Sequence, residues 1–211
     1  PGAGVVDEVY AAKDADPSAL EVAVNWHLIH NYAGYGVSTT AVGVSRNTGQ
    51  YMTVAPYNAK IRRSADYGET WTEVASSPST VWSACSVCDT GQYQIAAYSS
   101  GYLYTSNDYG ASWTQRTGAG SRSWGHVVVS SSGQYMAAIA SAGTASSVYV
   151  SSDYGVTWTA KLTSQTYASI AISGNGSTLI VSRSGVNNVY VSTDYGINWS
   201  TAKTVGSLSA I

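Results

Sequence analysis

The sequence predicts an all-β chain built from repeated units of four short strands. Three observations lead to this prediction: a recurring motif, a second marker with nearly the same period, and the absence of a convincing helical pattern. The motif is Ser-x-Asp-Tyr-Gly-x-x-Trp, and it occurs four times, at spacings of 42, 45 and 41 residues. The second marker, Gly-Gln-Tyr, recurs every 42 residues from Gly49, and a Gly-Ser-Thr variant follows at Gly176.

A period just above forty residues that contains several short strands is the signature of a β-propeller blade. The second copy shows the pattern best, because its β-rich runs TVWSACSV, YQIAAYS, YLYTS and WTQRT are separated by turn residues. We therefore predict a β-propeller of four-stranded antiparallel blades with almost no helix.

The repeats place the blades at residues 38–76, 77–118, 119–162 and 163–203, and residues 204–211 match the start of a fifth unit. Within residues 1–37, apolar and polar residues alternate from Leu20 to Leu28, which is typical of a long amphipathic strand. A ring must close to remove its edge strands. We therefore expect the N-terminal strands to complete the last blade, giving one five-bladed domain over residues 1–211. A piece of a larger propeller, or closure by pairing with another chain, is the alternative.

The motif resembles the Asp-box, or BNR repeat, of sialidases, sortilin-type receptors, xyloglucan-cleaving enzymes and photosystem-assembly propellers. The resemblance covers about residues 38–211 and implies a scaffold rather than an activity, because these families share little else. In that family the box joins the third and fourth strands of a blade. The matching residues here are Ser64, Asp66, Gly68, Trp71, Ser106, Asp108, Gly110, Trp113, Ser151, Asp153, Gly155, Trp158, Ser192, Asp194, Gly196 and Trp199.

Each box residue has a structural role that physical chemistry predicts. A carboxylate such as Asp153 can accept backbone N–H bonds across the turn. Gly155 tolerates the positive φ of a tight turn, and Trp158 should bury its ring between blades. Four regular aspartates could also suggest catalysis or calcium binding. A catalytic group is needed once, however, and not once per blade, so we interpret the boxes as structural.

Composition narrows the choice of partners. The net charge is −2, from 10 basic and 12 acidic residues, and no basic stripe is present, which disfavours a nucleic-acid partner. No run is long enough for membrane insertion. Charged residues are only 10% of the chain, and 17 Tyr and 7 Trp accompany a complete absence of Phe. This style is typical of secreted, cell-surface or virion proteins, so we expect one of these locations.

Two departures from the repeat are candidate ligand-binding sites. Trp82, Trp124 and Tyr167 form an aromatic column where the first strand of a blade begins, which could be a stacking platform for sugar rings. The alternative is packing between blades. Arg62 and Arg63 stand where other blades have Tyr followed by Thr or Val, and could bind a carboxylate or sulfate. The alternative there is an exposed edge made soluble by charge.

Neither a metal nor a cofactor is predicted. Cys85 and Cys88 form an isolated Cys-x-x-Cys without two further ligands at suitable spacing. Cys85 shares a core column with Val127 and Ile170, and Cys88 a column with serines. We therefore interpret Cys85 as a core residue and Cys88 as an end-of-strand residue.

The sequence as a whole favours a non-catalytic binding or structural module that recognises a glycan or a protein surface, with self-association or membership of a larger assembly possible. One alternative is a sialidase-like glycoside hydrolase, but no arginine lies in a Phe-Arg-Ile-Pro-type context. A glycosidase carboxylate pair also cannot be assembled from matching repeat positions. The other alternative is a purely architectural repeat domain.

Overall fold

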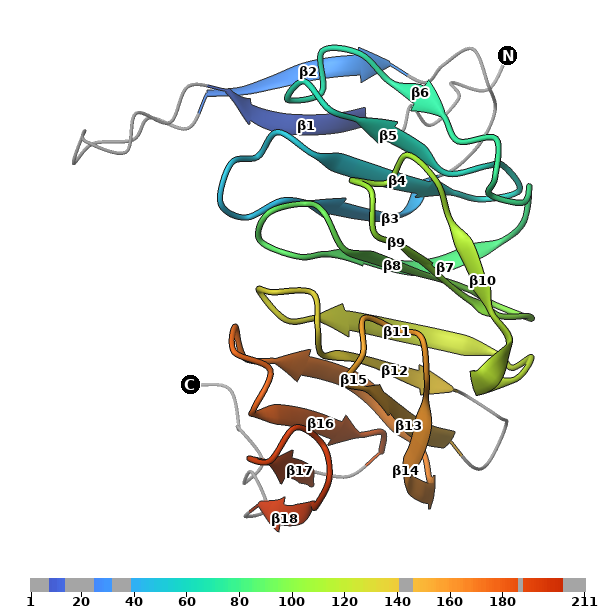
Figure 1. The fold of residues 1–211 in the computed structure, drawn as a ribbon, viewed down its shortest axis with the longest axis vertical. Helices are drawn as coiled ribbons and strands as arrows, with labels where there is room; N and C mark the ends of the chain where they lie inside the picture. The colour runs from blue at the N-terminus through green and yellow to red at the C-terminus, as the bar shows by residue number, and fades with distance from the viewer. Residues whose placement is uncertain (1–7, 14–24, 32–38, 141–145, 186–187, 203–211) are drawn as a thin grey trace, which may run out of the picture.

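The computed structural model describes residues 8–13, 25–31, 39–140, 146–185 and 188–202. In these residues, four antiparallel sheets of four strands each follow one another along the chain (Figure 1). Every sheet is a simple meander, because strands that are consecutive in the sequence are neighbours in the sheet. The predicted four-stranded antiparallel units are thus confirmed.

The strand bounds follow the repeat. The first sheet contains β3 (Thr39–Val44), β4 (Met52–Pro56), β5 (Arg62–Ser64) and β6 (Thr72–Glu73). The second contains β7 (Trp82–Val87), β8 (Gln94–Tyr98), β9 (Leu103–Ser106) and β10 (Thr114–Arg116). The third contains β11 (Trp124–Val129), β12 (Met136–Ala140), β13 (Ser146–Ser151) and β14 (Thr159–Gln165). The fourth contains β15 (Tyr167–Ile172), β16 (Leu179–Arg183), β17 (Val189–Ser192) and β18 (Ser200–Ala202).

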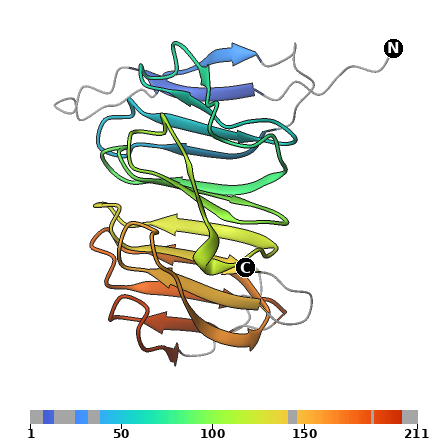
Figure 2. The ribbon, with the colours of Figure 1, turned by 45° about the vertical axis from the view of Figure 1, so that its right-hand side comes forward.

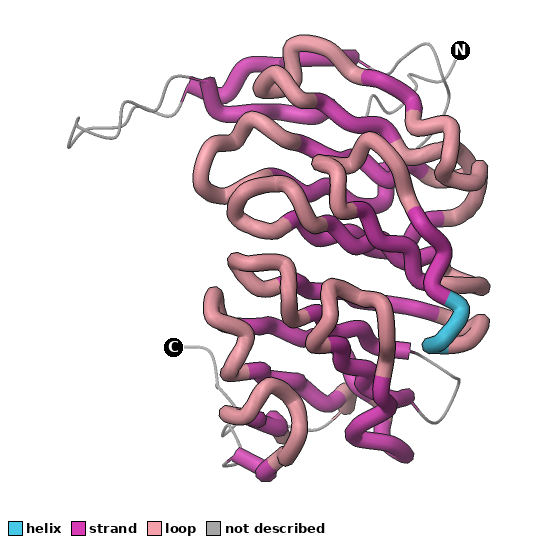
Figure 3. The backbone as a smooth tube through the Cα atoms, viewed as in Figure 1, coloured by secondary structure: helices cyan, strands magenta, loops and turns pink. Residues whose placement is uncertain are grey.

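Helix is almost absent, as the sequence predicts. The helical element of the described residues is one 3₁₀ turn, η1 (Thr117–Ala119), drawn in cyan in Figure 3. Figure 2 shows the four sheets from a second direction, with the same succession along the long axis. The first strands of successive sheets, β3, β7, β11 and β15, lie next to one another. The sheets therefore contact their neighbours as propeller blades do.

The N-terminal strands β1 (Glu8–Lys13) and β2 (Asn25–Asn31) pair with each other in a separate two-stranded sheet. In Figure 1 this hairpin lies at one end of the row, beside the first sheet, and β18 lies at the other end. The expected closure of the last blade depends on residues 14–24 and 203–211, which lie outside the described residues. The five-bladed ring therefore stays a prediction.

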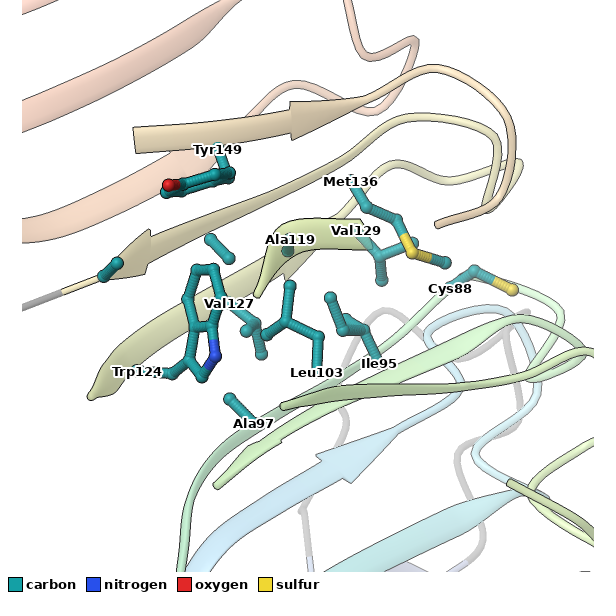
Figure 4. Packing of buried hydrophobic residues seen from close by; sticks show 12 residues of the cluster. Cys88, Ile95, Ala97, Leu103, Ala119, Trp124, Val127, Val129, Met136 and Tyr149 are labelled. Atoms are coloured by element: carbon teal, nitrogen blue, oxygen red, sulfur yellow. The ribbon is translucent and has the colours of Figure 1, made fainter. Parts of the chain in front are cut away.

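The hydrophobic core is divided into layers between adjacent sheets. Ile95 and Leu103 of the second sheet pack against Trp124, Val127 and Val129 of the third (Figure 4). Similar clusters lie between the first and second sheets and between the third and fourth. Each sheet therefore buries apolar side chains against a neighbour, and the contact between repeats stabilises the fold.

Candidate functional site

The Asp-box turn is a closed network of short hydrogen bonds. In the third box, the Ser151 hydroxyl donates to Asp153 Oδ1 (2.8 Å) and accepts the Gly155 N–H (3.0 Å). Asp153 also accepts the backbone N–H of Thr157 at Oδ1 (2.9 Å) and the Thr157 hydroxyl at Oδ2 (2.6 Å). The Trp158 indole N–H donates to the Gly155 carbonyl at 2.9 Å. The serine, the carboxylate and the indole together tie the turn to the start of the fourth strand.

The other three boxes repeat this network. The Ser-to-Asp bond measures 2.7–2.8 Å in all of them, and the indole N–H donates to the box glycine carbonyl at 3.0–3.2 Å. The box glycines have φ between 78° and 89°, which matches the positive φ predicted from the sequence. The tyrosine before each glycine also has a positive φ, 61° in every box, and the sequence analysis missed this feature. The backbone N–H of Tyr154, for example, donates to the Gln134 carbonyl at 3.0 Å, so this box is joined to the Gly-Gln-Tyr turn of its own sheet. The fourth box is joined in the same way to the Gly-Ser-Thr turn, through the Ser177 carbonyl.

The hydrogen bonds keep the box aspartates ionised. The Thr70 hydroxyl is the largest influence on the pKa of Asp66 and holds it below its usual value, assisted by the Thr70 N–H and by Ser64. For Asp153, burial is the largest single influence and acts to raise the pKa, but the bonds from Thr157 and Ser151 together outweigh it, so the pKa is lowered. A carboxylate held in this way is a poor proton donor at neutral pH.

Three of the four box tryptophans pack between sheets, and Trp71 is partly buried and belongs to none of the clusters between sheets. Trp113 is buried in the cluster between the first and second sheets. Trp158 packs on the cluster between the second and third sheets, and Trp199 on the cluster between the third and fourth. Each of these indoles therefore faces the preceding sheet and joins the turn to the core.

The proposed aromatic platform is buried. Trp82, Trp124 and Tyr167 are only 0%, 1% and 4% exposed. The Trp82 N–H donates to the Ala59 carbonyl (3.0 Å) and the Trp124 N–H to the Gly101 carbonyl (2.9 Å), both in a turn of the preceding sheet. A sugar can stack only on an exposed ring face, so the packing interpretation fits this structure and the platform interpretation does not. The sequence could not separate the two, because both need aromatic residues at these positions.

Arg62 lies opposite an acidic residue. It pairs with Glu73 across β5 and β6, and its Nη2 lies 3.7 Å from Glu73 Oε2. Lys60 Nζ lies 3.8 Å from the other oxygen of Glu73, so this carboxylate partly neutralises the predicted positive patch. Arg63 pairs with Thr72 and is partly buried. The sequence analysis missed Glu73 as a partner because that pairing depends on the register of two very short strands.

The cysteines occupy ordinary repeat positions. The Cys88 sulfur accepts the Tyr93 N–H at 3.2 Å, as the Ser130 hydroxyl accepts the Tyr135 N–H at 3.1 Å. Burial raises the pKa of the Cys85 thiol to about 12, so it is neutral at physiological pH. In the described part of the chain, no group of three or more His, Cys, Asp or Glu side chains could hold a metal ion.

A row of tyrosine pairs crosses the boundaries between sheets. The tyrosine of each Gly-Gln-Tyr marker contacts the box tyrosine of the following sheet, with ring centroids 4.3–4.4 Å apart; the pairs are Tyr51–Tyr109, Tyr93–Tyr154 and Tyr135–Tyr195. The box tyrosines are 36–50% exposed, so this row reaches solvent. Both periodic motifs of the sequence contain a tyrosine, which was the available signal. The sequence analysis did not predict that the tyrosine of one motif contacts the tyrosine of the other.

The third of these pairs borders a groove of about 300 Å³ between the third and fourth boxes. Tyr135 and Tyr195 line it together with Ile197, which is 60% exposed. Lys161 of β14 also lines it, and Ser152, Thr157 and Thr159 add hydroxyl groups. Rings, an aliphatic side chain, hydroxyls and one ammonium group thus meet in an open groove, which is a suitable surface for a polar ligand with apolar faces. We take this groove as the candidate site.

Comparisons with known proteins agree with the turn geometry. The model of the BNR/Asp-box repeat family matches residues 190–201, the fourth box. No curated protein sequence matches the chain. Among the described residues, no helix is long and apolar enough to cross a membrane.

Several solved structures have a similar fold at low sequence identity. The GH74 enzyme of Niastella koreensis aligns with a TM-score of 0.62 at 19% identity, over 77% of this chain and 24% of that one. YCF48 from Cyanidioschyzon merolae aligns with a TM-score of 0.55 at 14% identity, over 81% and 57% of the two chains. A chain of the nidogen/laminin complex aligns with a TM-score of 0.61 at 9% identity, over 77% and 64%. The chain thus spans about a quarter of the length of the GH74 enzyme. The chain thus carries the BNR/Asp-box repeat and has the β-propeller fold of these structures.

Proposed function

We propose that the protein is a non-catalytic propeller module that recognises a glycan in the groove between its third and fourth boxes. The observation that carries this proposal is the meeting of Tyr135, Tyr195 and Ile197 with several hydroxyl groups in one open groove. Sugar rings have C–H faces that pack on aromatic and aliphatic side chains, and hydroxyls that exchange hydrogen bonds with polar groups. The composition supports a place for such a module outside the cell or on a virion surface.

Recognition is a better fit than hydrolysis for the residues near this groove. A glycoside hydrolase needs one carboxyl group that is protonated and a second at a defined separation from it. The carboxylate of the third box, Asp153, accepts bonds from Ser151 and Thr157 and has a lowered pKa. It is therefore engaged in the turn and supports the box rather than a reaction.

The structures of similar fold are compatible with more than one use. One is the xyloglucanase Xcc1752 of Xanthomonas campestris, with a TM-score of 0.60 at 15% identity over 77% of this chain and 29% of that one. Another lies in a complex of nidogen with laminin. Such likeness concerns the scaffold. The choice of a glycan over a protein surface therefore rests on the groove of this chain.

A glycan array followed by titration calorimetry tests the proposal with Tyr195→Ala. We expect the wild-type chain to bind at least one class of glycan, and the substitution to weaken binding about tenfold because one face of the site is removed. Tyr109→Ala is the matched control, because Tyr109 is also a box tyrosine with a partner 4.4 Å away but lies outside the groove. An array without any bound glycan, or equal losses in the two variants, would contradict the proposal.

A further inference from the structure

The groove contains a positive charge whose surroundings differ from those of its counterpart one repeat earlier. Lys161 lies three residues after Trp158, and Arg116 lies three residues after Trp113, so the two occupy the same place in consecutive repeats. Lys161 pairs with Val148 in the sheet, and its side chain lines the groove. The repeat thus places a basic residue beside two successive boxes, which allows a direct comparison.

Arg116 is held by groups of the protein itself. Its Nε donates to the Thr105 hydroxyl at 2.6 Å. Burial lowers the pKa of Arg116, and the negative charge of Asp153, in the next box, partly opposes this effect. Arg116 therefore has an internal hydrogen-bond acceptor and a nearby opposite charge, and both compete with any anionic ligand.

Lys161 has no counterpart of the hydroxyl group that Arg116 uses. The residue that corresponds to Thr105 is Val150, since each directly precedes the serine of its box, and a valine side chain cannot accept a hydrogen bond. Val150 packs towards the fourth box as Thr105 packs towards the third: a Cβ built on Gly196 would lie 2.7 Å from Val150 Cγ1, and one built on Gly155 would lie 2.6 Å from Thr105 Cγ2. The ion pairs found among the described residues join Arg46 to Asp89 and connect Lys60 and Arg62 to Glu73. None of them includes Lys161 or Arg116, so the two basic residues differ in the hydroxyl acceptor.

From this contrast we infer that the glycan bound in the groove is acidic, with a carboxylate or sulfate group that pairs with the Lys161 ammonium group. The inference rests on the proposed function and adds the chemical class of the ligand. The Lys161 ammonium group can donate up to three hydrogen bonds to one anionic substituent, while the sugar ring packs on Tyr195 and Ile197 of the same groove. The chain as a whole is slightly acidic, with a net charge of −2, so the attraction of an acidic glycan must be local.

The test compares three probes of equal length on the full chain: an oligogalacturonate, a sulfated dextran oligosaccharide and a neutral cello-oligosaccharide. At low salt we expect one of the two acidic probes to bind the wild-type chain about tenfold or more tightly than the neutral probe. The acidic probe that binds distinguishes a carboxylate from a sulfate. Added salt should reduce this preference, because screening weakens an exposed ion pair.

Substitutions then locate the charge. Lys161→Gln should abolish the preference for the acidic probe, Lys161→Arg should retain most of it, and Arg116→Gln should leave it unchanged. Far-ultraviolet circular dichroism checks that each variant is folded. Equal binding of acidic and neutral probes, or equal effects of Lys161→Gln and Arg116→Gln, would overturn the inference while the proposed glycan recognition stands. The inference of an acidic ligand would also be overturned if none of the three probes bound while other neutral glycans bound on the array. If no glycan bound on the array, the proposed function itself would be contradicted.

Discussion

A substitution at Gly133 tests whether each Gly-Gln-Tyr turn is a contact point between sheets. A Cβ at this position would lie 2.4 Å from Tyr93 Cβ and 2.5 Å from Tyr93 Cδ2 in the preceding sheet. Carbon atoms pack best at about 3.5–4.0 Å, so the two turns must separate by about 1 Å. Tyr93 cannot relieve the overlap by changing rotamer, because its own Cβ makes the closest contact.

The expected loss of stability in Gly133→Ala has two parts. The backbone φ of 84° costs an alanine about 1–2 kcal/mol of strain. The overlap with Tyr93 adds about 1–3 kcal/mol, the usual cost of overpacking. Gly49→Ala is the matched control, because Gly49 begins the same marker with a φ of 70°, but no described atom lies within 4 Å of its Cβ position. The control should show the strain alone.

Urea unfolding followed by tryptophan fluorescence measures the difference. We expect Gly133→Ala to lower the free energy of unfolding by about 1–3 kcal/mol more than Gly49→Ala. The comparison requires that the slope of free energy against urea concentration is the same in both variants. A changed slope would indicate that the chain unfolds in more than one step, as repeat chains can. Equal losses of stability would refute the argument that the tyrosine of one sheet must lie over the turn of the next.

Three further outcomes follow from the same structure. Trp124→Ala should destabilise the chain by about 3–5 kcal/mol in urea unfolding, because it removes a buried indole, and Trp124→Phe should cost clearly less; similar losses would contradict the packing role. Because the folded-state pKa of Asp66 is lowered, the stability that this carboxylate contributes is present above its unfolded pKa of about 4 and is lost as the pH falls through the folded value. We therefore expect the melting temperature to decline between pH 5 and pH 2.5, and to decline less steeply in Thr70→Ala. Identical declines in the two proteins would contradict this expectation. Cys88→Ser should change the unfolding free energy by less than about 1 kcal/mol, since a serine hydroxyl can accept the same backbone N–H, whereas Cys88→Ala should cost more.

The sequence by itself determined the features that depend on contacts within one repeat. The hydrogen bonds of the box serine, aspartate and indole side chains join residues at most four positions apart, such as Ser151 and Gly155, so their geometry follows from local chemistry alone. The period, the strand order within a sheet and the positive φ of the box glycines could be predicted for the same reason. The family resemblance followed from this local motif as well.

The tertiary structure alone decided the contacts that join one repeat to another. Alternation along a strand separates its two faces, but it does not say which face another sheet covers. The burial of Trp124 against the Gly101 turn, the contact between Tyr135 and Tyr195, and the groove beside them all depend on how one sheet is placed over the next. Residues far apart in the sequence meet there only when the sheets pack, and this is why the candidate site was found between the repeats and not within one of them.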